Sequence, residues 1–208
     1  MIIAVDGPAA SGKGTIARAL SEHYALPYLD TGLLYRAVGV ACARVGGDAD
    51  CESDAAAACG FSDALLSDPE LRSEAAGSFA SRVSVHPAVR AALLERQRAF
   101  AAQAGGAILD GRDIGTVIAP YADAKLFIIA TPEIRARRRS IDDASKSYEV
   151  ILADIIARDA RDTGRSSAPL LMADDADLLD TSDLTIRAAV ERAIALVEGR
   201  ISRNCVSS

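Results

Sequence analysis

Residues 7–15 have the residue types and the spacing of a phosphate-binding loop. They read Gly-Pro-Ala-Ala-Ser-Gly-Lys-Gly-Thr and follow the apolar run of residues 1–5, with Asp6 between the two. The glycines allow the backbone to curl so that several N–H groups point inward, and a helix that begins near Lys13 adds its partial positive end. Lys13 can reach the β- and γ-phosphates of a nucleotide, and the hydroxyl of Thr15 can hold Mg²⁺. This loop therefore predicts that the chain binds a nucleoside triphosphate.

Acidic and basic side chains follow two other expected strands. Asp30 and Arg36 come after the second strand, and Asp110 and Arg112 come after the third. Because ligands bind at the carboxyl ends of parallel strands, we expect these side chains to face the ligand crevice. Arg grips phosphate through two parallel hydrogen bonds, so the arginines favour phosphate binding. The alternatives are that Asp30 only caps a helix and that Asp110 only ends a strand.

A third motif lies on an expected helix near the C-terminal end. Residues three or four apart share one helical face, and here these are Arg158, Arg161, Asp162 and Arg165. On an exposed helix such charges commonly form solvated salt bridges, and the spacing alone leaves this alternative open. In a chain that also carries a phosphate loop, we expect this face to bind phosphate.

The apolar pattern predicts the elements that position these motifs. Buried strands of the parallel type are expected at residues 2–6, 107–110 and 125–130, with shorter strands at 27–30 and 177–180. Helices are expected at residues 14–23, 31–44, 88–104, 148–162 and 184–198, with further helix starts at Asp68 and Thr131. Thr31 is expected to cap the second helix, and the tail from Gly199 is expected to fray. Strands that alternate with helices indicate an α/β fold with a parallel sheet.

Length, composition and charge limit the class of protein. The 208 residues, half of them apolar, suit one α/β core with small insertions. A net charge of −6 argues against broad binding to nucleic acid, and no apolar run approaches the roughly 20 residues of a membrane helix. The chain begins with a strand rather than a secretory signal, so we expect a cytoplasmic protein. No C-x-x-C motif occurs, and reduced, non-catalytic thiols are expected at Cys42, Cys51, Cys59 and Cys205.

Several longer motifs occur in order along the chain. They are Gly-Lys-Gly-Thr in the phosphate loop, Pro-Ala-Val-Arg at 87–90, Leu-Asp-Gly-Arg-Asp-Ile-Gly-Thr at 109–116, Arg-Asp-Ala-Arg-Asp at 158–162 and Ala-Pro-Leu at 168–170. With these motifs the chain resembles the bacterial cytidylate kinases nearly from end to end. The resemblance implies a P-loop NTPase fold, with a five-stranded parallel sheet, helices on both faces, a monophosphate-binding excursion and a short arginine-rich lid.

The resemblance also implies boundaries within a single domain over residues 1–208. The core is expected at residues 1–37, 87–137 and 149–199, the excursion at about 38–86 and the lid at about 138–148. Compared with longer members of the family, the chain is short between Cys59 and Leu71 and again at residues 140–147, a polar stretch that we expect to be mobile. The shape of the excursion and of the lid therefore stays open.

An activity and a set of site residues follow from the same resemblance. The expected reaction moves the γ-phosphoryl group of ATP to CMP or dCMP, with Mg²⁺ held largely by the nucleotide and water. The expected ATP-binding residues are Gly7, Pro8, Ala9, Ala10, Ser11, Gly12, Lys13, Gly14, Thr15, Arg135, Arg138 and Arg139. The expected CMP-binding residues are Thr31, Tyr35, Arg36, Ser81, Arg90, Asp110, Arg112, Asp113, Arg158, Asp162 and Arg165. Those expected to be catalytic are Lys13, Arg112, Arg138 and Arg165.

The resemblance divides the CMP-binding set further. Cytosine offers an exocyclic amine to a carboxylate and a hydroxyl, and its O2 and N3 to a guanidinium. The residues that match this task are Ser81, Arg90 and Asp113. The sugar is expected to be held by Arg158 and Asp162. The acceptor phosphate is expected to be clamped by Arg36, Arg112 and Arg165.

Two other functions compete with this interpretation. One is a monophosphate kinase with another base preference, and the pair Asp113 and Arg90 argues for cytosine instead. The other is a P-loop switch protein, which would need a base-reading motif such as Asn-Lys-x-Asp that the chain lacks. The expected partners are therefore ATP and CMP or dCMP, with no nucleic acid and no membrane, and the protein is expected to be a monomer.

Overall fold

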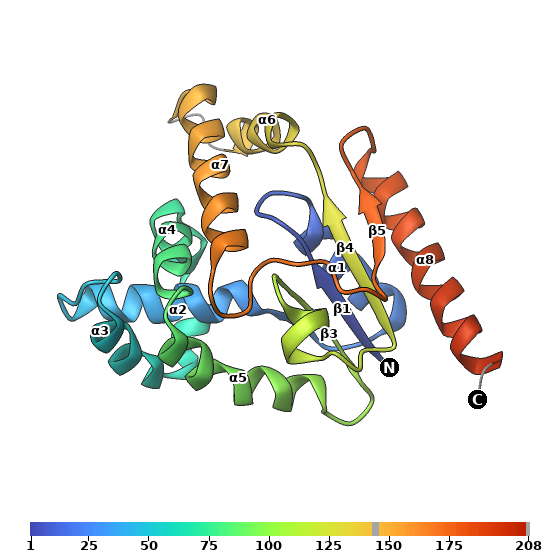
Figure 1. Ribbon diagram of the computed structural model, residues 1–208, viewed down its shortest axis with the longest axis horizontal. Coiled ribbons are helices and arrows are strands. Elements are labelled where there is room, and N and C mark those ends of the chain that lie inside the picture. Colours follow the sequence, from blue (N-terminus) through green and yellow to red (C-terminus); the bar gives the residue numbers. More distant parts are fainter. Residues whose placement is uncertain (143–145, 207–208) are drawn as a thin grey trace. The chain divides into compact units, whose positions relative to one another are not determined.

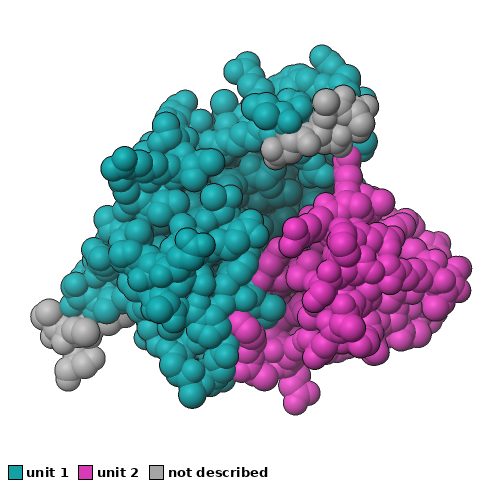
Figure 2. All heavy atoms as spheres, turned by 180° about the vertical axis from the view of Figure 1, so that it is seen from behind, with its two compact units in different colours: residues 1–29, 101–208 teal, residues 30–100 magenta. Residues whose placement is uncertain are grey.

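The computed structural model describes residues 1–142 and 146–206 of the chain (Figure 1). The chain divides into two compact units, which Figure 2 colours separately. We call residues 1–29 and 101–208 the sheet unit, and residues 30–100 the helical unit.

A five-stranded sheet runs through the described part of the chain. Its strands are β1 (Ile2–Asp6), β2 (Tyr28–Asp30), β3 (Ala107–Gly111), β4 (Ala124–Ile129) and β5 (Asp177–Asp180). Their order is β2-β3-β1-β4-β5, and β1 pairs in parallel with β3 and β4, as β4 does with β5. The predicted parallel sheet is confirmed, and the strand that leads into the phosphate loop lies at its centre.

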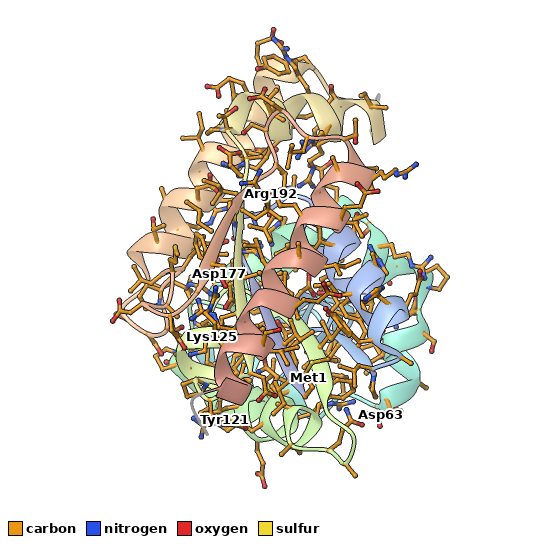
Figure 3. The ribbon with its side chains drawn as sticks, turned by 90° about the vertical axis from the view of Figure 1, so that its right-hand side faces the viewer. Met1, Asp63, Tyr121, Lys125, Asp177 and Arg192 are labelled. Atoms are coloured by element: carbon orange, nitrogen blue, oxygen red, sulfur yellow. The ribbon has the colours of Figure 1, made fainter. Side chains whose placement is uncertain are left out.

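Two helices cover one face of this sheet. They are α1 (Lys13–Tyr24) and α8 (Ile186–Val206), and Figure 3 shows α8 with Arg192 labelled on it. Their apolar residues join those of the strands in one buried cluster, which includes Ile3, Val5, Leu20, Leu126, Ile128, Ala193 and Val197. The prediction for the last helix was too short, because α8 continues past Gly199 and Ile201 still packs against this cluster.

The opposite face carries a short helical turn. Successive strand residues point to opposite faces, so Asp6 lies on the face away from Ile3 and Val5. There its carboxylate meets the turn η4 (Ile114–Ile118), which has the wide hydrogen bonding of a π-helix. The sequence pattern did not predict this turn, because five residues are too few to show a helical period.

The helices α6 (Pro132–Asp142) and α7 (Tyr148–Gly164) pack as a pair in the sheet unit. Ala136 of α6 is buried against Ile151 and Ile155 of α7. The first part of the expected lid is therefore an ordered helix that includes Arg138 and Arg139. Residues 143–145, in the middle of that lid, lie outside the described residues, so its bounds stay a prediction.

The helical unit is built from helices and short helical turns. In order they are α2 (Thr31–Arg44), α3 (Glu52–Ala57), η1 (Ala58–Gly60), η2 (Asp63–Ser67), η3 (Pro69–Arg72), α4 (Glu74–Val83) and α5 (Pro87–Ala101). Gly39 lets α2 and α4 approach closely, because a Cβ there would overlap the side chain of Phe79. The unit extends beyond the expected excursion at 38–86, since α2 and most of α5 belong to it.

Several element boundaries differ from the predictions. Thr31 is the first residue of α2 rather than its cap, because Asp30 keeps an extended backbone (ψ 100°) and takes the N-cap position. At Asp68 the structure has the short turn η3, and the longer helix α4 follows with Ser73 as its cap. Helix α5 ends at Ala101, before the left-handed glycines Gly105 and Gly106. None of the helices in the described ranges is long and apolar enough to cross a membrane.

Candidate active site

The phosphate-binding loop joins β1 to α1 and has the tight backbone that its sequence predicts. Gly7 has a φ of 151°, and a Cβ there would overlap the carbonyl oxygen of Ile128. Ala10 and Gly12 also have positive φ values, 59° and 90°. A positive φ is unusual for alanine and marks a strained turn of the kind found at ligand sites. Nothing in the sequence singled out Ala10 for this conformation.

Helix α1 begins at Lys13, with Gly12 at its N-cap. Glycine has no side chain that could accept from the backbone N–H groups of the first turn, so no capping side chain competes there with a ligand, as in an anion site at a helix start. The side chain of Thr15 is exposed on the first turn. The hydroxyl of Ser11 is buried and has no hydrogen-bond partner among the described residues. The loop thus keeps polar groups that a phosphate could use.

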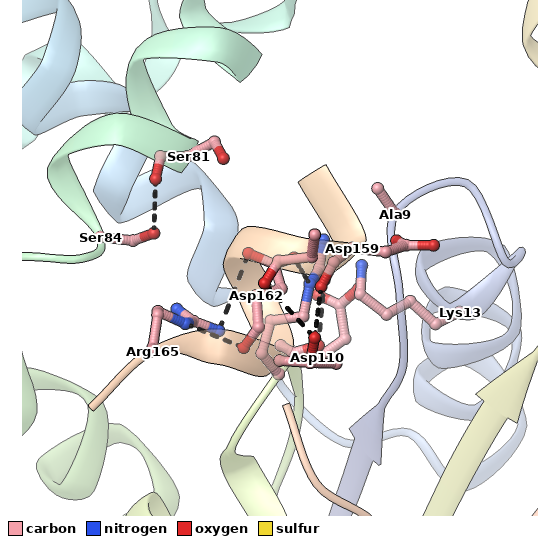
Figure 4. A network of polar contacts seen from close by, with 12 residues as sticks. Ala9, Lys13, Ser81, Ser84, Asp110, Asp159, Asp162 and Arg165 are labelled. Atoms are coloured by element: carbon pink, nitrogen blue, oxygen red, sulfur yellow. Dashed lines mark hydrogen bonds and ion pairs between the residues drawn. The ribbon is translucent and has the colours of Figure 1, made fainter. Parts of the chain in front are cut away.

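Lys13 lies next to the carboxylate of Asp110, near the end of β3. Its Nζ is 3.3 Å from Oδ2 of Asp110, and the hydroxyl of Tyr28 donates to Oδ1 of the same carboxylate at 3.1 Å (Figure 4). Asp110 is only 1 % exposed. The structure therefore gives Asp110 a contact that the sequence did not predict, which is to hold the loop lysine. Its expected contact with CMP stays a prediction.

Part of the charged face predicted for residues 158–165, at the end of α7, is buried. Nε of Arg112 donates to Oδ2 of Asp162 at 2.7 Å, and Nη2 of Arg165 lies 3.8 Å from Oδ1. Asp162 is 3 % exposed and Arg165 is 8 % exposed, whereas Arg161 is exposed. Burial therefore contradicts a solvated salt-bridge face for Asp162 and Arg165, whereas Arg158 is half-buried and Arg161 is exposed.

The electrostatics of this cluster keep Asp162 ionised. Burial disfavours its charge, but the guanidinium groups of Arg112 and Arg158 outweigh burial and hold the pKa of this carboxyl below its usual value. We call Arg112, Arg158, Asp162 and Arg165 the acceptor cluster. It combines several cations with one carboxylate, which suits a ligand that carries both a phosphate and sugar hydroxyls.

Two of the three arginines expected in or beside the lid, Arg135 and Arg138, already bind protein oxygens. Arg135 is 2 % exposed, and its guanidinium donates to the carbonyl of Ala9 in the phosphate loop and to Asp159 of α7 at distances of 3.1 and 3.0 Å. Arg138 donates to the hydroxyl of Thr181, just after β5, at 3.0 Å. Arg135 thus ties the loop to α7. The expected contacts of Arg135, Arg138 and Arg139 with ATP stay predictions.

In the helical unit, two of the three residues expected to read cytosine, Ser81 and Arg90, are linked through Ser84. The guanidinium of Arg90 lies 5.7 Å from the ring centre of Tyr35, and its Nη1 donates to the carbonyl of Ser84 at 3.5 Å. The Ser84 hydroxyl donates to the carbonyl of Ser81 at 3.2 Å. Sequence reasoning missed Ser84, which joins Ser81 to Arg90.

Two other predicted residues of this unit lie on α2. Thr31 is 3 % exposed. Nη1 of Arg36 donates to the carbonyls of Leu71 and Ser73, at 2.8 and 3.3 Å. In the structure this arginine therefore fastens η3 and the start of α4, and its contact with an acceptor phosphate stays a prediction.

The P-loop and the parallel sheet place the chain among the P-loop NTPase folds, and solved structures agree. The chain is similar to a gluconokinase from Sinorhizobium meliloti, with a TM-score of 0.57 and 14 % sequence identity over 100 % of this chain and 97 % of that one. A protein from Eubacterium ventriosum gives a TM-score of 0.58 at 15 % identity, over 95 % of this chain and 98 % of that one. At such low identity these similarities establish the fold alone.

Sequence comparison gives the family. The cytidylate kinase family matches residues 3–199. A cytidylate kinase of Xanthobacter autotrophicus is 55 % identical over 96 % of this chain and 98 % of its own length. One from Caulobacter vibrioides is 53 % identical over 98 % of both chains. The chain therefore belongs to the cytidylate kinase family and is a kinase, as its motifs predicted.

Proposed function

We propose that this protein transfers the γ-phosphoryl group of ATP to the phosphate of CMP or dCMP, which yields ADP and CDP or dCDP. The observation that carries the proposal is the register of two neighbouring strands. Asp6, the last residue of β1, pairs with Gly111, the last residue of β3. The phosphate loop and the segment with Arg112 therefore begin at the same edge of the sheet, which supports a donor site beside an acceptor site.

The donor half consists of the phosphate loop and Lys13. Backbone N–H groups at the start of α1 would hold the phosphates of ATP, and Lys13 would neutralise charge on the β- and γ-phosphates. The described residues contain no group of three or more His, Cys, Asp or Glu side chains that could hold a metal ion. The exposed hydroxyl of Thr15 suits Mg²⁺ whose other ligands are phosphate oxygens and water, and Mg²⁺ so bound would neutralise charge on the transferred group.

The acceptor half is the acceptor cluster. We propose that Arg112 and Arg165 bind the phosphate of CMP, and that Asp162 and Arg158 bind its sugar. Arg36 of the helical unit is proposed to bind the same phosphate. For the base, we propose that Asp113 accepts from the exocyclic amine, and that Ser81 and Arg90 contact the remaining polar edge.

The chemistry needs positioning more than acid–base catalysis. An oxygen of the CMP phosphate forms a bond to the γ-phosphorus while the bond from that phosphorus to the β–γ bridging oxygen of ATP breaks, and ADP leaves with that electron pair. The attacking oxygen is already an anion, so no strong general base is required. The cations must hold two repelling phosphates in line and stabilise the charge that spreads over the transferred group. Arg138 would join them by exchanging Thr181 for an ATP phosphate.

Initial rates with ATP and each of CMP, dCMP, UMP, AMP and GMP test this proposal. We expect fast, comparable rates with CMP and dCMP, slower turnover with UMP, and very little with the purines. ATP alone should be hydrolysed slowly, since the second nucleotide is the acceptor. A higher rate with a purine monophosphate would contradict the base preference, and hydrolysis of ATP that no monophosphate accelerates would favour a switch protein instead.

A further inference from the structure

Asp6 ends β1 and immediately precedes the phosphate loop. Its carboxylate is 5 % exposed and accepts two backbone hydrogen bonds from η4. Oδ1 accepts from the N–H of Ile114 at 2.9 Å, and Oδ2 accepts from the N–H of Gly115 at 2.8 Å. These two donors directly follow Asp113 in the chain. The carboxylate therefore links the start of the phosphate loop to the segment that carries the residues proposed for CMP.

We propose that Asp6 is a positioning residue whose ionised carboxylate holds η4, and with it Arg112 and Asp113, in place beside the phosphate loop. This proposal rests on the proposed function, because it assigns Arg112 and Asp113 to the bound CMP. Asp6 itself touches no reacting atom in this scheme.

The geometry explains why an ionised carboxylate is needed. The first N–H groups of a helical turn have no partner inside the turn, and two of them converge on Asp6. An ionised carboxylate accepts at both oxygens, whereas a neutral carboxyl or an amide turns one of its two positions into a donor. That donor would face an N–H group, so η4 would have to shift. The carbonyl of Asp113 already accepts from Val117 and Ile118, which closes the turn on its other side.

The charges that face Asp6 set its protonation. Burial raises the pKa of Asp6 to about 7, the N–H bonds from Gly115 and Ile114 oppose that rise, and Asp113 adds to it while Arg112 lowers it. From β4, the aliphatic part of Lys125 packs near Gly115, and its ammonium binds Asp175 at 2.8 Å. Loss of the Asp6 charge below about pH 7 should therefore loosen η4.

The pH dependence has a sign that separates positioning from stability. Because the pKa of Asp6 is raised in the folded protein, folding favours its protonated form, so its contribution to the free energy of unfolding falls as the pH rises toward 7. The hydrogen bonds that position η4 have the opposite pH dependence. They strengthen as the pH rises, because they need the ionised form of Asp6. As the pH falls through about 7, the fold should gain stability from Asp6 while CMP binding weakens. If Asp6 only stabilised the fold, the free energy of unfolding and the affinity for CMP would change in the same direction with pH.

The test compares Asp6→Asn with the parent protein by steady-state kinetics from about pH 6 to about pH 8.5. At high pH we expect KM for CMP to rise about tenfold or more, as for a lost hydrogen bond to a charged group, with KM for ATP within about twofold. The CMP phosphate titrates in both assays, so its effect cancels in the comparison. Toward low pH, KM for CMP should therefore rise more steeply in the parent, because only the parent also loses the charge of Asp6. Val197→Ala, which opens a cavity under α8, is the matched stability control and should leave KM for CMP unchanged.

Two results would overturn the proposal. The first requires that the parent phosphorylates CMP. The proposal then fails if the Asp6→Asn variant has an unchanged KM for CMP, or if its KM for CMP and its KM for ATP rise equally. The second result is an NMR titration of the parent protein alone. It applies even if the variant does not fold or CMP is not the substrate. The backbone amide NMR signals of Ile114 and Gly115 should shift with a midpoint near pH 7, unlike that of Gly60, and signals that stay fixed would contradict the hold.

Discussion

Arginine–carboxylate pairs occur in both units, but their surroundings differ. In the sheet unit, Arg112 and Asp162 meet at 2.7 Å with side chains 14 % and 5 % exposed. In the helical unit, Arg44 and Asp68 meet at 2.6 Å with side chains 47 % and 28 % exposed. The distances are nearly equal, and the residue types are the same. Geometry alone therefore does not distinguish a candidate ligand site from a surface salt bridge.

Burial makes the difference between the two pairs. A buried ion pair needs compensation for lost hydration, and removing one partner leaves an uncompensated charge. An exposed pair between solvated side chains contributes only about 0–1 kcal/mol. The buried charges at the carboxyl edge of the parallel sheet are thus the candidates for contact with a charged ligand, while the pairs of Arg44, Arg82 and Arg96 are surface contacts.

The largest effect should come from the phosphate loop. Lys13→Ala removes a cation that is needed more in the transition state than in the ground state, so kcat should fall by roughly a hundredfold or more. Steady-state assays with ATP and CMP measure this, with Arg187→Ala as the control, since that arginine is 88 % exposed and forms an i,i+4 surface pair. If Lys13→Ala retains activity within about threefold of the parent, the loop does not act as proposed.

The acceptor cluster should divide into two kinetic classes. Asp162→Ala should raise KM for CMP and dCMP by about tenfold while KM for ATP stays near the parent value, because the sugar loses an acceptor. Arg165→Ala should instead lower kcat, because a phosphate clamp aligns the attacking oxygen. A two-substrate rate matrix separates these outcomes. Asp63→Ala, which removes an 81 % exposed carboxylate from the Arg96 pair, is the matched control. Equal, small changes in the kinetic constants for ATP and CMP would mean that this part of α7 has only a structural role.

Base selection should depend on Asp113. Asp113→Ala leaves the amine of cytosine without its acceptor, and a lost buried polar partner costs about 1–3 kcal/mol. The ratio of kcat/KM for CMP to that for UMP should fall accordingly, by about tenfold or more. Competition assays with both nucleotides measure this ratio directly. An unchanged ratio would assign base reading to other residues.

The smallest effect is expected at the exposed pair. Arg44→Ala removes both ion pairs of this arginine, with Asp68 and Glu70, yet the free energy of unfolding should fall by no more than about 1 kcal/mol. Urea denaturation and the CMP kinase assay should both stay close to the parent. A loss of activity as large as that of Asp162→Ala would remove the contrast between the two kinds of pair.

Much of the fold and part of the site were predictable because their signals are local. The glycines and Lys13 of the phosphate loop lie within nine consecutive residues, and runs such as 107–110 mark buried strands by composition alone. Errors occurred where a boundary depends on packing. Helix α8 extends beyond its predicted end at residue 198, because Ile201 packs against the core cluster. The residues around Ile201 give no local signal of that contact.

The sequence by itself determined the order of strands and helices, the phosphate loop and the family, because each rests on residue types at short spacings. Tertiary structure decided which charges are buried. Asp162 meets Arg112 across 50 positions of sequence, and Asp6 meets Ile114 across 108. Such pairs depend on the register of β1 with β3 and on how α7 packs, and no local pattern encodes either. The burial of Asp162 against Arg112 and the contact of Asp6 with η4 therefore became visible only when the folded chain brought these segments together.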